Sequence, residues 1–448
     1  MYSWTVLELW FDFSCPYAYL ASRRAPAVAR DAGVTLMWRP MLLGGVFRGI
    51  GAGDGPNATL GPAKARHNYQ DMHRWAELFG ARFRLPAAHP MRTVRALRVL
   101  LALPDSRWDV AIEAIFAAYW QRAEDITRDD VIAAALAAAG VSDADIAAAL
   151  ARADDMKDEL RRRTEEAIAL GIFGAPAWVI RRAGDHVLIW GQDRIEWVSA
   201  VLAGWDPEVG PPPGGPRRIT ASTPEMERSQ RTLASATEME RSQRTLASAI
   251  DCYFDVASPF AYLGLTQLPA LADTTLRLRP ILLGGLFRDI GQADVPLFAM
   301  NPPKQRYVAR EMVRWARWWG VPFDSPRKFP QRTVQAQRLC ILAAERGATE
   351  GVRLATALGR AMWAEQRDLE DRETLRAVLA ECGLPPDWVN HTSDPELKAK
   401  LVANTEAAKA AGVFGVPTFI VDDKYLFWGQ DRLDLVTRAL AGWKPVHG

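Results

Sequence analysis

The sequence predicts an α/β fold that occurs twice in one chain of 448 residues. One observation is that stretches of sequence recur in the same order, such as FDFSCPYAYL at 11–20 and FDVASPFAYL at 254–263. The other is that each copy passes from apolar, β-rich runs to helical spacing and back again. Because the offset between the copies stays between 238 and 243 residues, the repeat is a domain duplication and not a solenoid of short units.

Each copy opens with an apolar run, at 6–13 and 252–256, that ends before a proline and gives way to helical spacing. A second β-rich run follows at 34–39 and 276–279, which predicts a β-α-β start with parallel strands. Repeated start and stop residues in the next tract predict several short helices. After Pro176 and Pro417 come paired strands, at 177–180 with 186–190 and at 418–421 with 425–428, and then a final helix that begins near Gln192 or Gln430.

The domain boundaries follow from this pattern: a first domain at 1–205, a linker at 206–249 and a second domain at 250–445. The linker starts with a Pro- and Gly-rich stretch at 206–219, which predicts a stiff spacer. The segment EMERSQRTLASA then occurs twice, at 225–236 and 238–249. It is either an interaction helix or a solvated linker. We favour the linker, because a shift of 13 residues places the two sets of apolar side chains on different sides of a helix.

Composition narrows the possible functions. Lys and Arg number 55 against 53 Asp and Glu, so the charge balance does not point to nucleic acid or to an acidic membrane surface. The sequence has no run of about 18 apolar residues and no leader-like start, so we expect a cytoplasmic protein. Its four cysteines and six histidines lack the spacing of a disulfide framework or a zinc site, and no metal is expected.

The duplicated decapeptide places a small nucleophilic side chain, Cys15 or Ser258, between a buried strand and a proline-led helix. Proline at the first helical position makes the preceding residue the N-cap, where unpaired backbone N–H groups stabilise an anion. This predicts a thiolate at Cys15. A hydroxyl at Ser258 does not readily ionise, but it can donate a hydrogen bond to a thiolate brought by a ligand; the alternative is a plain helix cap.

The tripeptides GAP at 174–176 and GVP at 415–417 are candidates for cis proline bonds ahead of a strand. Together with the strand-Cys/Ser-Pro-helix start and the β-β-α finish, they resemble the thioredoxin fold with its active-site helix and facing cis-proline. The closer resemblance is to the DsbA-like branch with a helical insertion, namely the 2-hydroxychromene-2-carboxylate isomerases and kappa-class glutathione transferases. It rests on FDVASPFAYL, RPILLGGLFRDIG, GVFGVPTF and FWGQDR and on their partners in the first copy. It implies tandem duplicated thioredoxin-like (DsbA-like) domains, each with a helical insertion between the two halves of the thioredoxin fold.

The resemblance also implies site residues and glutathione as the cofactor. Ser258 matches the catalytic serine that holds glutathione's sulfur as a thiolate, and Cys15 occupies its place in the first copy. The other matching positions would bind glutathione in three ways: through the backbone beside the cis-proline, through the γ-glutamyl site at the last helix, and through a basic group near the carboxylate end. These positions are Val416, Pro417, Gln430, Asp431 and Lys304 in the second copy, and Ala175, Pro176, Gln192, Asp193 and Lys64 in the first. Helix-terminal N–H groups suit an α-carboxylate and the Asp suits an ammonium, although both Asp residues also complement their helix dipoles.

Three functions follow as hypotheses. The first is a glutathione-dependent isomerase or transferase that acts on a small aromatic acid, with glutathione's thiolate as transient nucleophile. The second is thiol-disulfide oxidoreduction, restricted to monothiol chemistry because CPYA at 15–18 lacks a resolving cysteine. In the third, one copy is catalytic and the other a structural pseudo-subunit, so that the two copies form an intramolecular pseudo-dimer.

Overall fold

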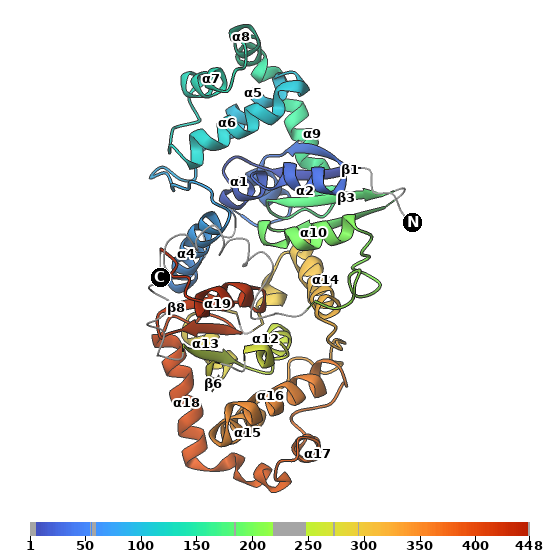
Figure 1. Cartoon of the computed structure of the whole chain (residues 1–448), viewed down its shortest axis with the longest axis vertical. Helices are drawn as coiled ribbons and strands as arrows, with labels where there is room; N and C mark the ends of the chain where they lie inside the picture. The colour runs from blue at the N-terminus through green and yellow to red at the C-terminus, as the bar shows by residue number, and fades with distance from the viewer. Residues whose placement is uncertain are drawn as a thin grey trace. The chain divides into compact units, whose positions relative to one another are not determined.

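The computed structural model describes residues 6–53, 55, 60–182, 185–217, 248–271, 274–293 and 295–446. The chain divides into two compact units (Figure 1). The first consists of Met1–Leu60, Asn68–Asp206 and Met300–Tyr307; the second consists of Gly61–His67, Pro207–Ala299 and Val308–Gly448. Each unit therefore holds most of one repeat together with a short segment of the other.

A four-stranded mixed sheet forms the centre of each unit. In the first unit the order is β2-β1-β3-β4, and in the second it is β6-β5-β7-β8. The outer strand β2 or β6 is parallel to its neighbour, whereas the last two strands run antiparallel. The bounds are Val6–Phe11 (β1), Thr35–Pro40 (β2), Ala177–Arg182 (β3), Asp185–Trp190 (β4), Ala249–Phe254 (β5), Thr275–Pro280 (β6), Thr418–Val421 (β7) and Tyr425–Trp428 (β8).

The central strands of both sheets are buried, as the apolar runs predict. The predicted β-α-β start and β-β-α finish of each repeat thus meet in one sheet, which is the thioredoxin-like arrangement. The edge strands β2 and β4 alternate between buried and more exposed residues, because one face of each is less covered.

Helices surround each sheet, and a block of short helices separates its two halves. The first unit has α1 (Pro16–Ser22), α2 (Ala25–Ala32), α3 (Leu43–Gly49), most of α4 (Pro62–Leu78), the insertion α5 (Val94–Ala102), α6 (Trp108–Trp120), α7 (Asp129–Ala138), α8 (Asp143–Arg152) and α9 (Lys157–Ala169), and the closing helix α10 (Ile195–Leu202). The second has α12 (Pro259–Leu265), α13 (Leu283–Asp289), most of α14 (Pro302–Trp319), the insertion α15 (Val334–Arg346), α16 (Ala348–Trp363), α17 (Arg372–Glu381) and α18 (Pro395–Ala410), and the closing helix α19 (Leu433–Leu440).

The insertion helices are hydrogen-bonded to the chain just ahead of the Cys15 and Ser258 positions. Trp120, at the end of α6, donates its indole N–H to the carbonyl oxygen of Phe13 at 2.8 Å. Trp363, at the end of α16, makes the same bond to Val256 at 2.9 Å. Both tryptophans are buried, so each bond is shielded from water. The helical block therefore fixes the loops that lead into α1 and α12.

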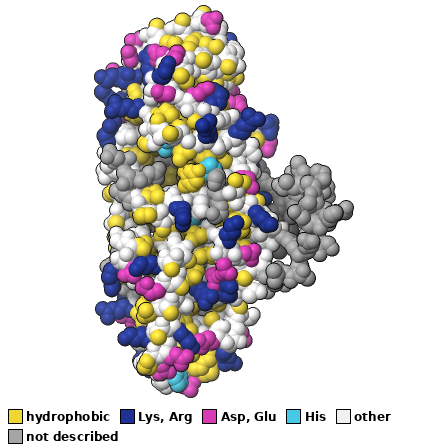
Figure 2. Space-filling model, turned by 90° about the vertical axis from the view of Figure 1, so that its left-hand side faces the viewer, with side chains coloured by type: hydrophobic (Ala, Val, Ile, Leu, Met, Phe, Trp, Pro, Cys, Tyr) yellow, Lys and Arg dark blue, Asp and Glu magenta, His cyan; other side chains and the backbone are white. Residues whose placement is uncertain are grey.

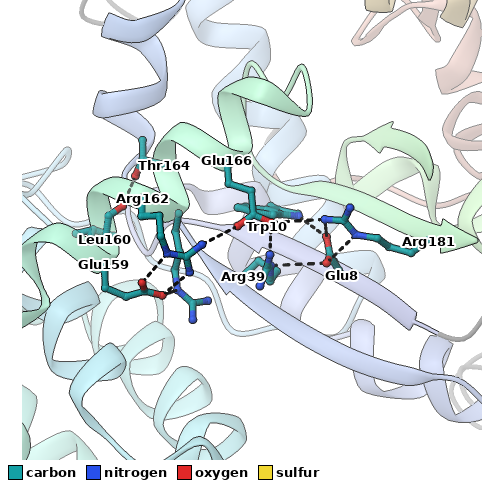
Figure 3. A network of polar contacts seen from close by, with 10 residues as sticks. Glu8, Trp10, Arg39, Glu159, Leu160, Arg162, Thr164, Glu166 and Arg181 are labelled. Carbon is teal, nitrogen blue, oxygen red and sulfur yellow. Dashed lines mark hydrogen bonds and ion pairs between the residues drawn. The ribbon is translucent and has the colours of Figure 1, made fainter. Parts of the chain in front are cut away.

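A buried carboxylate links the first sheet to the insertion (Figure 3). Glu8 on β1 is 4% exposed and accepts hydrogen bonds from the guanidinium of Arg181 on β3 at 3.0 and 3.1 Å. Arg39 on β2 lies 3.7 Å from Glu8 and also pairs with Glu166 on α9. In the second unit Asp251 occupies the place of Glu8 and pairs with Arg277 and Arg279 on β6. Glu8 and Asp251 are buried, whereas Arg181, Arg277 and Arg279 are 33–40% exposed, so water partly screens these ion pairs while they link neighbouring strands.

The start of the predicted linker packs in the second unit. Arg314 on α14 donates to the carboxylate of Glu208 at 2.6 and 2.9 Å, and Arg317 donates to the carbonyl oxygen of Pro207 at 2.6 Å. The backbone N–H of Arg217 donates to the carbonyl oxygen of Trp318 at 2.7 Å. Almost all of the duplicated segment at 225–249 lies outside the described residues, so its interpretation as a solvated linker stays a prediction.

Basic and acidic side chains are interspersed on the face shown in Figure 2, in keeping with the balanced composition. None of the helices described is both long and apolar enough to cross a membrane. Within the same residues, no group of three or more His, Cys, Asp or Glu side chains is arranged to hold a metal ion.

Candidate active sites

Ser258 lies between β5 and α12 and caps that helix. Its backbone is extended (φ −95°, ψ 122°), and its Oγ accepts a hydrogen bond from the N–H of Ala261 at 3.2 Å. The same hydroxyl donates to the carbonyl oxygen of Val416 at 3.3 Å, and the residue is 6% exposed. Ser258 therefore caps α12, as the alternative interpretation predicts. Its hydroxyl proton points at the carbonyl oxygen of Val416, the residue before Pro417.

Cys15 occupies the equivalent position ahead of α1, also 6% exposed. Its Sγ lies 3.1 Å from the carbonyl oxygen of Ala175 and donates to it, but makes no cap bond to the helix. Burial raises the pKa of the Cys15 thiol to about 12, more than the N–H groups of Ala18 and Tyr17 lower it, while the nearby Asp12 raises it further. The prediction that the helix N-terminus makes Cys15 a thiolate is wrong, because desolvation outweighs the hydrogen bonds.

The bonds Ala175–Pro176 and Val416–Pro417 are cis, as their GAP and GVP contexts suggested. Each proline carbonyl then accepts the N–H of the glycine after the last strand, Pro417 from Gly429 at 2.9 Å and Pro176 from Gly191 at 3.0 Å. These bonds place the two Gly-Gln-Asp-Arg segments beside the cis-prolines.

The segments form a single 3₁₀ turn, Gln192–Arg194 or Gln430–Arg432, that leads into the closing helix. Gln192 and Gln430 are buried, at 3% and 4% exposure. A Cβ on Gly264 of α12 would lie 3.1 Å from Pro417 Cγ and 3.4 Å from Gln430 Cβ, so α12, the cis-proline and the turn meet closely. The structure thus brings together the sequence-predicted residues Ser258, Val416, Pro417 and Gln430.

The aspartates of these turns each pair with the following arginine. Asp193 Oδ2 lies 3.0 Å from Arg194 Nη1, and Asp431 Oδ2 lies 3.0 Å from Arg432 Nη1, with all four side chains at most 14% exposed. The two turns are therefore the same structure formed twice, including the glycine before each, whose φ is 111° at Gly191 and 110° at Gly429.

The sequence places Lys64 in the first copy and Lys304 in the second. Lys64 lies in the second unit, with its ammonium 5.1 Å from the centre of the Trp428 ring. Lys304 lies in the first unit, 6.0 Å from the centre of the Trp190 ring. Each lysine is thus beside the tryptophan that ends the last strand of the other repeat.

Sequence reasoning gave no role to Asp12 and Asp255, the aspartates of the duplicated decapeptides. Asp255, 3% exposed, accepts hydrogen bonds from the N–H groups of Ala257 and Leu283 at 3.0 and 2.9 Å and from the Thr333 hydroxyl at 2.7 Å. Asp255 joins the loop ahead of Ser258 to α13 and to the start of the insertion, and Asp12 makes the matching bonds in the first unit. Burial raises the pKa of both carboxyls. The sequence offered one indication of this role, because an aspartate stands three residues before Cys15 and before Ser258 in the two copies.

Comparison with known proteins agrees with this architecture. The family model of the DsbA-like thioredoxin domain matches residues 6–203 and again residues 249–441. The chain is 31% identical over 193 residues to the 2-hydroxychromene-2-carboxylate isomerase of Sphingobium xenophagum, which covers 42% of this chain and 95% of the relative. It is 24% identical over 216 residues to glutathione S-transferase kappa 1 of Homo sapiens, covering 43% and 90%.

Among solved structures, that of a 2-hydroxychromene-2-carboxylate isomerase is 27% identical, covers 43% of this chain and 94% of that chain, and superposes with a TM-score of 0.38. The two relatives named above are enzymes of the DsbA-like superfamily. With its two matched regions spanning most of the sequence, this chain belongs to the DsbA-like thioredoxin domain family and contains that domain twice.

Proposed function

We propose that the protein is a glutathione-dependent isomerase that acts on a small aromatic acid through the thiolate of bound glutathione. The observation that supports this most directly is the Ser258 hydroxyl, held at the N-cap of α12 and 3.3 Å from the carbonyl oxygen beside the cis-proline. A hydroxyl in this position can donate to a sulfur anion without itself ionising. The similarity to 2-hydroxychromene-2-carboxylate isomerase favours this reaction over others.

In the proposed complex, the backbone of Val416 pairs with the cysteinyl part of glutathione, and the turn at Gln430 and Asp431 holds the γ-glutamyl group. The N–H groups at the start of the last helix suit its α-carboxylate, and the Asp431 carboxylate suits its ammonium. Ala175, Gln192 and Asp193 would do the same in the first unit, where their turn has the same geometry.

The chemistry needs no further cofactor. The glutathione thiolate adds to an electrophilic carbon of a conjugated double bond, and the electron pair of that bond moves to the neighbouring carbonyl. Rotation about the resulting single bond and expulsion of the thiolate then give the isomer, so glutathione is regenerated. Ser258 stabilises the thiolate before addition and after expulsion.

A cytoplasmic location is part of the proposal. Cys15, Cys252, Cys340 and Cys382 are all free and buried, which suits a compartment where glutathione keeps thiols reduced.

Calorimetric titration of the full chain with reduced glutathione tests the proposal. The full chain is needed because each unit includes a segment of the other repeat. We expect two binding sites in the wild type, one in Asp193→Ala and one in Asp431→Ala. Conversion of 2-hydroxychromene-2-carboxylate, followed by absorbance, should require added glutathione. Absence of binding below millimolar concentrations in the wild type would refute the proposal.

A kappa-like glutathione transferase is the first alternative, because the same bound thiolate could be retained in the product. Mass spectrometry of the small-molecule products separates the two: an isomerase leaves the substrate mass unchanged, whereas a transferase adds the mass of glutathione.

The second alternative, monothiol oxidoreduction at Cys15, is less favoured because burial holds this thiol in its protonated form. Incubation with oxidised glutathione and intact-mass measurement tests it. In that reaction Cys15 would gain a disulfide to one glutathione and release the other as its thiol. An adduct that is lost in Cys15→Ser would support the alternative, and the absence of an adduct would leave the isomerase as the explanation for both units.

A further inference from the structure

The second unit has a cavity of about 400 Å³ against its outer strand, away from the Ser258 site. Strand β6 lines it from Leu276 to Pro280, the end of α15 lines it with Ile341, and α18 lines it with Lys400 and Asn404. The lining includes neither Ser258 nor the cis-proline loop nor the Gly-Gln-Asp-Arg turn. Sites for small molecules commonly have volumes of about 300–1,000 Å³, so the cavity has room for a small ligand.

The first unit has bulky side chains in the region that corresponds to this cavity. Trp108, at the start of α6, is 8% exposed and donates its indole N–H to the carbonyl oxygen of Leu103 at 3.3 Å. The guanidinium of Arg163 on α9 lies 5.3 Å from the centre of the Trp108 ring. Asn404 takes the place of Arg163 on α18, because each stands directly before a threonine that accepts the N–H of the N-cap residue of α3 or α13.

The indole has no counterpart in the second copy. Trp120 and Trp363 make the same hydrogen bond and so align α6 with α16. In that alignment Gly351 stands in the place of Trp108. A Cβ on Gly351 would lie 2.5 Å from Leu278 Cδ1, so α16 packs on β6 at this point without a side chain. The second unit therefore leaves open a space that an aromatic ring fills in the first.

A carboxylate is missing from the same region. In the first unit, Arg39 on β2 pairs with Glu166 on α9 (Figure 3). Arg279 is the matching arginine of β6, but Ala407 stands in the place of Glu166. Arg279 donates through Nε to Asp251 at 2.7 Å, and among the described residues no hydrogen bond uses its terminal nitrogens Nη1 and Nη2. Two donors of a guanidinium that lines the cavity are thus available to a ligand.

The charges around the cavity favour an anionic ligand. Three cations line it against one acid, namely Arg277, Arg279 and Lys400 against Glu345. Lys400 pairs with Glu345 at 2.6 Å, and Arg277 pairs with two aspartates. Since these two cations have acidic partners, the terminal nitrogens of Arg279 are the donors that an incoming carboxylate meets.

We propose that this cavity binds a small aromatic carboxylic acid. Its ring occupies the space of the missing indole, and its carboxylate pairs with Nη1 and Nη2 of Arg279, as Glu166 pairs with the matching arginine in the first unit. A guanidinium matches a carboxylate through two parallel hydrogen bonds. Leu276, Leu278 and Ile341 supply an apolar wall for the ring. The site is separate from the glutathione site, and the inference does not rest on the function proposed above.

Titration of the full chain with indole-3-carboxylate tests the inference, by calorimetry for affinity and by hydrogen-exchange mass spectrometry for location. We expect binding to the wild type, with slower exchange in β6, at the end of α15 and in α18. Arg279→Gln should weaken binding by about ten- to a hundredfold, the range expected for loss of charge-assisted hydrogen bonds. Because this variant also loses the ion pair to Asp251, a second variant leaves the arginine in place.

Ala407→Glu restores to the second unit the carboxylate that pairs with the arginine of the first. Ala407 is exposed, so the fold should tolerate the change, and the new carboxylate should compete for Arg279 and weaken binding at least about tenfold. Val402→Glu is the matched control, because it adds the same charge at an exposed position on a different side of α18. It should leave the affinity unchanged, and equal weakening by the two variants would overturn the role of Arg279.

Two further comparisons assign the parts of the ligand. Indole-3-carboxamide, which has no charge, should bind the wild type about as weakly as the acid binds Ala407→Glu, and Ala407→Glu should not weaken it further. Ala348→Phe places a ring on the wall of the cavity and should abolish binding of both compounds, because the space for the ligand ring is then filled.

Three results would overturn the inference. One is absence of indole-3-carboxylate binding to the wild type at millimolar concentration. Another is slower exchange only in the peptides that contain Ser258 and Pro417, because the acid would then occupy the proposed catalytic site. The third is equal affinity for the acid and the carboxamide, which would exclude pairing with Arg279. These titrations contain no glutathione, so their failure is distinguishable from a failure of the proposed isomerase.

Discussion

The hydroxyl of Ser258 donates a hydrogen bond to the carbonyl oxygen of Val416, the residue before the cis-proline. At 3.3 Å the bond is long for two oxygens, whose usual separation is about 2.7–2.8 Å. The Ser258 hydroxyl can therefore exchange this carbonyl oxygen for a stronger hydrogen-bond acceptor. A ligand thiolate beside Val416 would be such a partner.

Replacement of Ser258 by alanine should lower kcat/KM for the proposed isomerisation by about a hundredfold, as expected for loss of one donor to a reacting anion. It should also destabilise the fold by about 1 kcal/mol, since the α12 cap is lost. Steady-state rates and chemical denaturation measure the two effects. Ser142→Ala is the control, because Ser142 caps α8 by the same bond, to Asp145, within the insertion. It should reproduce the loss of stability and leave the rate unchanged; if both variants lose activity equally, Ser258 acts only as a cap.

Alkylation of Cys15 by iodoacetamide should be very slow near pH 7.5 and should accelerate about tenfold for each pH unit up to pH 12. Burial raises the pKa to about 12, so the reactive thiolate is a minor species throughout this range. Intact-mass spectrometry over a pH series that the fold survives measures the rate, with Cys15→Ser to assign the modified residue. Rapid alkylation at neutral pH would show instead that the helix N-terminus prevails over desolvation.

Gly429→Ala should destabilise the second unit by about 1–3 kcal/mol, because its φ of 110° is strained for a residue with a side chain. The new Cβ would also lie 2.3 Å from Asp431 Oδ1, so the aspartate must move and glutathione binding should weaken. Gly284→Ala is the matched change, since a Cβ there meets no atom within 4 Å inside α13. It should stabilise the protein by up to about 1 kcal/mol. Urea denaturation and glutathione titration compare the two, and equal effects would contradict the structure of the turn.

The Asp255 carboxyl should make the protein less stable as the pH rises from about 4. Burial raises the pKa of Asp255 in the folded protein above the ordinary value of 3.8. Its contribution to the free energy of unfolding is therefore complete below pH 3.8 and is lost as the pH rises through the pKa of the folded state. The difference in unfolding free energy between the wild type and Asp255→Asn should therefore shrink with rising pH. Asp371, whose pKa is lowered by the N–H groups that it caps on α17, provides the opposite case. For Asp371→Asn the difference should shrink as the pH falls, and slopes of the same sign would contradict the assignment.

The sequence was sufficient for the strands, the closing helices and the positions of Cys15 and Ser258 ahead of their helices, because these depend on local patterns. Apolar runs that end at proline give buried strands and N-caps, and the repeat confirms each pattern independently. The Ser258 cap and the cis bonds at Pro176 and Pro417 are of this kind. The sequence also identified the Gly-Gln-Asp-Arg turns, since both copies retain them unchanged.

The protonation state of Cys15 and the partners of Lys64 and Lys304 were decided by the tertiary structure. Desolvation depends on everything that packs around the thiol, and no local motif records it, so the helix N-terminus alone gave the wrong charge for Cys15. Similarly, the spacing within a repeat locates each lysine along its own chain segment but not the sheet against which that segment packs. The duplicated sequence by itself determined two equivalent domains with Cys15 and Ser258 at matching N-cap positions. The tertiary structure decided that each lysine lies beside the tryptophan of the other repeat, because that pairing depends on contacts between residues hundreds of positions apart.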